Sequence, residues 1–95
     1  MQVMARLTEQ HVERIAAALA EPRRFKILRD LAAHPGAMTC GAIVDRHRVS
    51  QATISHHLKE LEGAGLIEIV KEGKFSNVTL RRDVWAAYVA RLASL

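Results

Sequence analysis

The chain has 95 residues, of which 49% are hydrophobic and 25% charged, with five glycines and two prolines. A chain of this length builds one compact core, and its composition excludes the collagen-like, disordered and disulfide-stapled classes. We therefore predict a single globular domain over residues 1–95. The formal charge of +4 favours a polyanionic partner. The basic excess falls in residues 21–49 and 71–82.

The single cysteine, Cys40, excludes an intramolecular disulfide framework and fits a reducing compartment. Residues 1–14 contain charged side chains and no apolar run long enough for a signal peptide or a membrane span. We expect a cytoplasmic protein with no membrane partner. The sequence shows no Gly-rich phosphate loop, metal-ligand cluster or catalytic triad spacing, so we expect neither an enzyme nor a cofactor.

Two helices are predicted in the first third of the chain. Apolar residues recur at helical spacing over residues 8–20, with Thr8 as the N-cap. Several alanines leave this helix without a strongly polar face, which indicates burial against both the domain core and a partner. Pro22 suits the first position of a second helix, which ends near Ala33 because residues 34–36 are His-Pro-Gly.

A helix-turn-helix is predicted over residues 39–63. A short helix covers residues 39–46, and Ser50 is the expected N-cap of the next helix, which ends at the glycines of residues 63–65. The apolar stripe of this fourth helix follows i, i+4 and i+7 spacing and consists of Ile54, Leu58 and Leu61.

The last third of the chain predicts a hairpin followed by a helix. Residues 66–70 and 75–80 favour β-strands, and the charged residues 71–74 separate them, so residues 66–80 form a wing. Helical spacing returns over residues 83–95, with Asp83 at the helix start. The predicted fold is mainly α (α+β), a winged helix-turn-helix of five helices and a two-stranded β-hairpin in the order α-α-α-α-β-β-α.

The fourth helix can present a polar face to the major groove of DNA. A recognition helix must turn one face to its own domain and offer hydrogen-bonding side chains on the other. With about 100° between successive residues, the candidates on and beside the arc opposite the apolar stripe are Gln51, Ala52, Thr53, Ser55, His56 and Lys59. His57 lies nearer the core side, and we expect it to pack or hydrogen-bond within the domain.

The basic blocks flank this helix. The candidates for contact with DNA phosphates are Arg46, Arg48, Ser50, Lys71 and Lys74. The basic residues of the second helix, Arg23, Arg24, Lys26 and Arg29, lie further from the groove and are expected mainly as a solvated face. A Ser-capped amphipathic helix also occurs in proteins that bind no DNA, so the prediction depends on the order of all the elements.

From about Val12 to Leu92 the chain resembles the ArsR family of bacterial winged-helix repressors. The resemblance is carried by LAEPRRFKIL (residues 19–28), VSQATISHHLKEL (49–61) and GAGLI (63–67), with KEGK (71–74) similar to the family's wing. It implies a sequence-specific DNA-binding regulator, a repressor, whose first and last helices pair in a homodimer that binds a palindromic operator. The interface candidates, some of which must belong to the core, are Val12, Ile15, Leu19, Trp85, Tyr88, Val89 and Leu92.

The metal sites known in this family are not matched. Many members use a Cys-x-Cys motif in the third helix, where this chain retains only Cys40, and no histidine follows residue 57 to complete a site in the last helix. We expect no metal site. Two alternatives stay open: a redox or metal response through Cys40, with His47 and His34 as further ligands, and a winged-helix module that binds a protein. No residue pattern identifies an effector.

Overall fold

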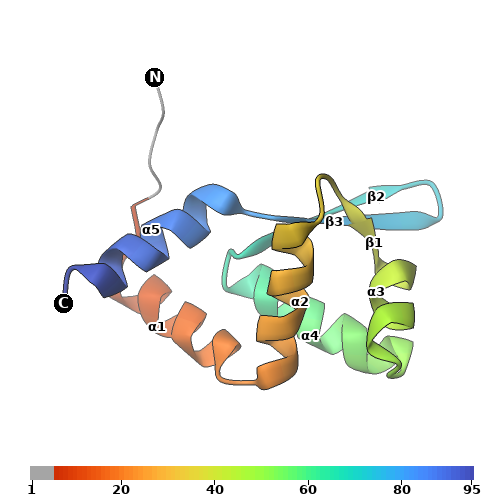
Figure 1. Cartoon of the computed structure of the whole chain (residues 1–95), viewed down its shortest axis with the longest axis horizontal. Coiled ribbons are helices and arrows are strands. Elements are labelled where there is room, and N and C mark those ends of the chain that lie inside the picture. Colours follow the sequence, from red (N-terminus) through yellow and green to blue (C-terminus); the bar gives the residue numbers. More distant parts are fainter. Residues whose placement is uncertain (1–5) are drawn as a thin grey trace.

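The computed structural model describes residues 6–95, so residues 1–5 of the predicted domain lie outside it (Figure 1). Five helices and a small sheet follow one another along the chain. Their bounds are α1 Glu9–Leu19, α2 Pro22–Ala33, β1 Met38–Thr39, α3 Cys40–His47, α4 Gln51–Gly63, β2 Ile67–Glu72, β3 Phe75–Leu80 and α5 Arg82–Ala93. The predicted winged helix-turn-helix is confirmed, and no helix within residues 6–95 is long and apolar enough to cross a membrane.

Side-chain caps explain where the first four helices begin. Thr8, Glu21, Thr39 and Ser50 each accept a hydrogen bond from a backbone N–H in the first turn of the helix that follows. Pro22 occupies the first position of α2, where no N–H is needed. The caps at Thr8 and Ser50 confirm the predicted helix starts, whereas α3 begins one residue later than predicted, because Thr39 is its cap.

The sheet has three strands instead of the predicted two. The strand order is β1-β3-β2, and β1 pairs antiparallel with β3 through Met38 with Val78 and Thr39 with Asn77. Two residues are too few to produce an alternating pattern in the sequence, so β1 was not predictable from periodicity. It binds the free edge of β3, and Met38, 8% exposed, joins the core.

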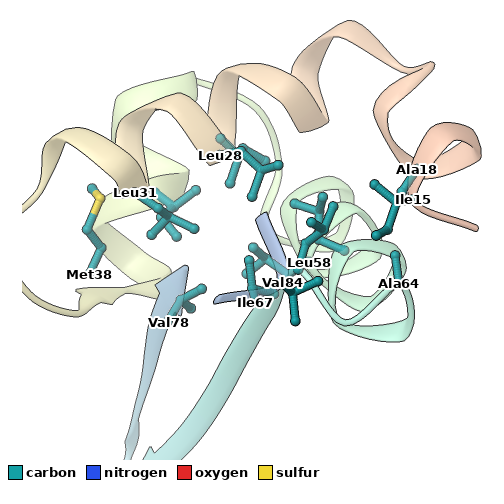
Figure 2. Packing of buried hydrophobic residues seen from close by; sticks show 14 of the residues in the cluster. Ile15, Ala18, Leu28, Leu31, Met38, Leu58, Ala64, Ile67, Val78 and Val84 are labelled. Atoms are coloured by element: carbon teal, nitrogen blue, oxygen red, sulfur yellow. The ribbon is translucent and has the colours of Figure 1, made fainter. Parts of the chain in front are cut away.

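The core lies where the helices meet the base of the hairpin. In Figure 2, Leu28 and Leu31 of α2 point toward Val78 and Ile67 of the sheet, and Leu58 of α4 lies among them. The predicted apolar stripe of α4 is confirmed, because its three members are at most 3% exposed. This burial fixes which face of α4 is turned outward.

The terminal helices and the wing lie at opposite ends of the molecule (Figure 1). Arg91 of α5 donates to the carbonyl of Leu7 at 2.8 Å and pairs with Glu9, which joins α5 to the start of α1.

The hairpin turn of the wing consists of Gly73 and Lys74, and Gly73 has φ +61°. A positive φ at the first of two turn residues suits glycine and is the arrangement of a type II′ hairpin.

Candidate nucleic-acid interface

The outer face of α4 is open to solvent along the whole helix. The predicted base-reading residues are all exposed: Gln51, Ala52, Thr53, Ser55, His56 and Lys59. At the N-terminal end, the Ser50 hydroxyl accepts from the Thr53 N–H at 3.1 Å and lies 2.9 Å from the Thr53 hydroxyl. The first turn of α4 is therefore fixed by its own cap, and its remaining N–H groups point out of the helix toward any approaching anion.

The turn between α3 and α4 has a left-handed residue that the sequence did not indicate. Arg48 ends α3 with φ 55° and ψ 39°, and its N–H donates to Val44 O. A non-glycine residue in this region is uncommon and costs some backbone energy, so the surrounding contacts must hold it. The turn places Arg46 and Arg48, both exposed, beside the start of α4.

A side-chain network supports this turn from α2. Asp30 accepts from His47 Nε2 at 2.9 Å and pairs with Arg46 Nε at 3.2 Å. Arg23 Nη1 lies 3.3 Å from both His47 Nδ1 and the His47 carbonyl. Because arginine only donates, Nδ1 accepts and Nε2 carries the proton donated to Asp30. The network joins α2 to the C-terminal end of α3.

Two arginines that we predicted on a solvated face of α2 are turned inward, which corrects that expectation. Arg23 binds His47, and Arg24 Nε donates to Ala18 O at 2.6 Å. Helical angles within α2 cannot show that the end of α1 and the end of α3 supply acceptors there. Lys26 and Arg29 remain exposed.

His57 packs inside the domain, as its position on α4 predicted. It is 8% exposed, Arg24 Nη1 lies 3.5 Å from its Nδ1, and a Glu21 oxygen lies 3.7 Å from its Nε2. Desolvation by burial lowers the pKa of His57 below its ordinary 6.5, although the nearby Glu21 acts in the opposite direction. Burial therefore favours the neutral imidazole of His57, whereas His56 on the next face is exposed.

The wing presents basic and apolar side chains together. Lys71 and Lys74 are exposed, and Lys74 Nζ lies 5.8 Å from the centre of the Phe75 ring. Phe75 is 56% exposed and Val70 is 43% exposed. Sequence reasoning missed Phe75 as a surface residue. The signal was available, because residues paired across a hairpin share a face and Phe75 pairs with the charged Glu72.

Cys40 borders the recess between α4 and the sheet and is half-buried. The recess is lined by Cys40, Ser55, Leu58, Lys59, Glu62, Ile69 and Ser76. The other two ligands of the mixed metal site considered above point elsewhere: His47 binds Asp30, and His34 Nδ1 donates to Gly36 O at 3.1 Å. Within residues 6–95, no group of three His, Cys, Asp or Glu side chains could hold a metal ion.

The predicted dimer residues divide by exposure. Val89 and Leu92 of α5 are 44% and 47% exposed. The half-buried members are Val12, Leu19 and Trp85. Ile15 and Tyr88 are only 0% and 6% exposed, so they belong to the chain's own core, which corrects their assignment to an interface. Phe25 of α2 is also an exposed apolar residue, at 45%, and it lines the same recess as Trp85.

Comparison with known proteins agrees with this geometry. Residues 19–70 match a family model described as a helix-turn-helix domain. The transcriptional repressor SdpR of Bacillus subtilis is 37% identical over 67 residues, which cover 70% of this chain and 72% of SdpR.

Two solved structures have the same fold. An ArsR-like transcriptional regulator from Rhodococcus is 25% identical with a TM-score of 0.77, covering 90% of this chain and 78% of its own. The homodimeric winged helix-turn-helix DNA-binding domain of a possible ArsR-family regulator from Mycobacterium bovis is 25% identical with a TM-score of 0.73. That alignment covers 96% of this chain and 90% of the other.

Proposed function

Because the chain belongs to the ArsR family of winged helix-turn-helix transcriptional regulators, we propose that it is a repressor that binds a palindromic operator as a homodimer. It acts in the cytoplasm by occupying DNA and catalyses no reaction. The observation that carries the proposal is the division of α4 into two faces. Its apolar stripe is at most 3% exposed, while every candidate base-reading residue is exposed.

The positions of the charges support contact with DNA on both sides of α4. Arg46 and Arg48 lie before its N-terminus, and Lys71 and Lys74 lie on the wing. The side chain of Arg46 is 62% exposed even though it pairs with Asp30, so its guanidinium is held by α2 and still faces solvent. Such cations fix a protein on the phosphate backbone, whereas the side chains of the helix read base edges.

The homodimer is supported by the end of the molecule opposite the wing. Val89 and Leu92 project from α5 into solvent, with 44% and 47% of their surface exposed. Exposed apolar side chains gathered on one helix mark an interaction surface. The Mycobacterium bovis relative is described as homodimeric. A two-fold dimer would place two α4 helices about 34–36 Å apart, one turn of DNA.

The first experiment is selection of bound sequences from a random DNA pool by the purified full chain, followed by titration of the selected operator. We expect a palindrome, and two protomers on each operator in analytical ultracentrifugation. A monomer that binds DNA one-to-one would contradict the dimer. Weak binding that ignores sequence would contradict the proposal and favour the protein-interaction module. Added Zn²⁺ or oxidant tests the Cys40 alternative, which predicts release from DNA.

Three substitutions distinguish side chains that contact bases from side chains that bind phosphates. Replacing Gln51 or His56 with alanine should reduce discrimination among sequences by about 1–3 kcal/mol where the side chain contacts a base. Lys74→Ala should weaken binding to all sequences alike and flatten the salt slope by about one unit. Lys26→Ala is the matched control, because it removes the same charge from an exposed site on α2. If the substitutions on α4 and the substitution of Lys74 had the same effect, the assignment of α4 to bases and of Lys74 to phosphates would be wrong.

A further inference from the structure

The side chain of His11 on α1 binds the C-terminal end of the candidate recognition helix. His11 Nε2 donates to the carbonyl of Ala64 at 2.8 Å. Ala64 is the C-cap of α4 and is 2% exposed. The last carbonyls of a helix have no partner within the helix, and an imidazole at this end satisfies one of them. Among residues 6–95, this is the one hydrogen bond that joins α1 to α4 or its cap.

Gly65, the residue after Ala64, makes room for His11 of α1. A Cβ added to Gly65 would lie 2.9 Å from His11 Nε2, which is shorter than real Cβ contacts, and Gly65 also has φ +77°. A Cβ added to Gly63 would lie 3.1 Å from Arg14 Nη2, but this atom is the end of a flexible, exposed side chain that can shift. Gly65 therefore does more than end the helix, because it lets the His11 ring approach the backbone closely.

Helix α1 is itself fastened to α5. Arg91 near the end of α5 donates to Leu7 O at 2.8 Å and pairs with Glu9. The two terminal helices are thus joined at the start of α1. His11 lies in the first turn of α1, two residues after Glu9. The contact from His11 to Ala64 connects this helix pair to α4.

We propose that His11 is a positioning residue that sets the orientation of α4 relative to the α1–α5 pair, and thereby the spacing of the two half-sites in the operator. The inference rests on the proposed homodimer. Helix α4 has 13 residues, so it is about 20 Å long. A tilt of about 10° at its C-terminal end would move its N-terminal end by about 3.5 Å, close to the rise of one base pair.

The test compares the selected operator with versions whose central spacer is one base pair shorter or longer. We expect the unmodified chain to prefer the selected spacing by about tenfold, a difference of about 1.4 kcal/mol. His11→Ala should reduce this preference to about threefold or less, while affinity for an isolated half-site and the dimer dissociation constant stay unchanged. His11→Gln should retain the preference, because its amide N–H can replace the imidazole donor.

Two further variants control for effects on folding. Gln10→Ala changes an exposed neighbour on α1 and should leave the preference intact. His11→Asn keeps a polar side chain but is too short to reach Ala64, so it should behave like His11→Ala, and thermal unfolding shows that each variant is folded.

If folded, dimeric His11→Ala kept the spacing preference, the role of His11 would be wrong but the proposed function would stand. An equal loss of affinity at the half-site and at every spacer would also overturn the role of His11, because that pattern indicates a merely structural role. A wild-type chain that is monomeric or binds no DNA would overturn the proposed function, and this inference with it.

Discussion

Replacing Asp30 with alanine removes the acceptor that joins α2 to the helix-turn-helix. Its two contacts differ in burial. His47 donates to Asp30 at 2.9 Å from a side chain that is 7% exposed, whereas Arg46 pairs with Asp30 at 3.2 Å from a side chain that is 62% exposed. The substitution leaves the His47 N–H without a partner in a place that water hardly reaches, while the Arg46 guanidinium returns to solvent.

The expected loss in the free energy of unfolding follows from this difference in burial. A buried hydrogen bond to a charged group contributes about 1.5–3 kcal/mol, and an exposed ion pair about 0–1 kcal/mol. We therefore expect Asp30→Ala to lower the free energy of unfolding by about 2–3 kcal/mol, and Arg46→Ala by less than about 1 kcal/mol. For a domain of this size, the larger loss corresponds to a decrease in Tm of roughly 10–20 °C.

The assay is urea unfolding, followed by far-ultraviolet circular dichroism and by Trp85 fluorescence. All variants must be compared at one protein concentration, because a dimer makes apparent stability depend on concentration. A double-mutant cycle of Asp30→Ala with His47→Ala should give a coupling energy of about 1–2 kcal/mol. Additive effects of the two substitutions, or a loss below about 0.5 kcal/mol for Asp30→Ala, would refute the reasoning.

Three further predictions concern α4. Burial lowers the pKa of His57 below 6.5, so the folded chain binds fewer protons than the unfolded chain; stability should rise with pH below 6.5 and be lost on acidification. His57→Gln should flatten this dependence and His56→Gln should not, as measured by urea unfolding between about pH 5 and 8. Ser50→Ala should cost about 1 kcal/mol and Ser50→Gly only a few tenths, because glycine tolerates the cap conformation. Ile54→Ala, at a fully buried position, should cost about 2–5 kcal/mol in the same assay.

The elements that the sequence predicts well are those determined by neighbouring residues. Thr8 and Ser50 cap their helices through N–H groups three residues away, and the buried stripe of α4 follows from helical spacing alone. The strand β1 is different, because its two residues become a strand only by pairing with the distant β3. Pairing of this kind has no local period that a sequence reader can detect.

The terminal helices show a second limit of periodicity. Apolar residues recur around most of α1, so spacing shows that the helix is covered on more than one side but not which side its own core covers. Ile15 is fully buried within the chain, whereas Val12 on the same helix is only half-buried. The same ambiguity affects α5, where Tyr88 is buried and Val89 beside it is exposed.

Two properties of α4 matter for recognition: which side chains it presents outward and in which direction it points. The histidines show why the sequence predicts the first property better than the second. His11, His47 and His57 contact groups 53, 17 and 33 residues away, respectively. No spacing rule connects such partners, so only the fold shows that these histidines join α4 and the turn before it to other helices. The outward face of α4 depends on helix geometry alone, and the sequence therefore predicts which side chains are presented to DNA. The direction in which α4 points depends on the long-range contacts. It follows that changes on the outer face should alter which bases are preferred, whereas changes at the long-range contacts should alter where the half-sites must lie.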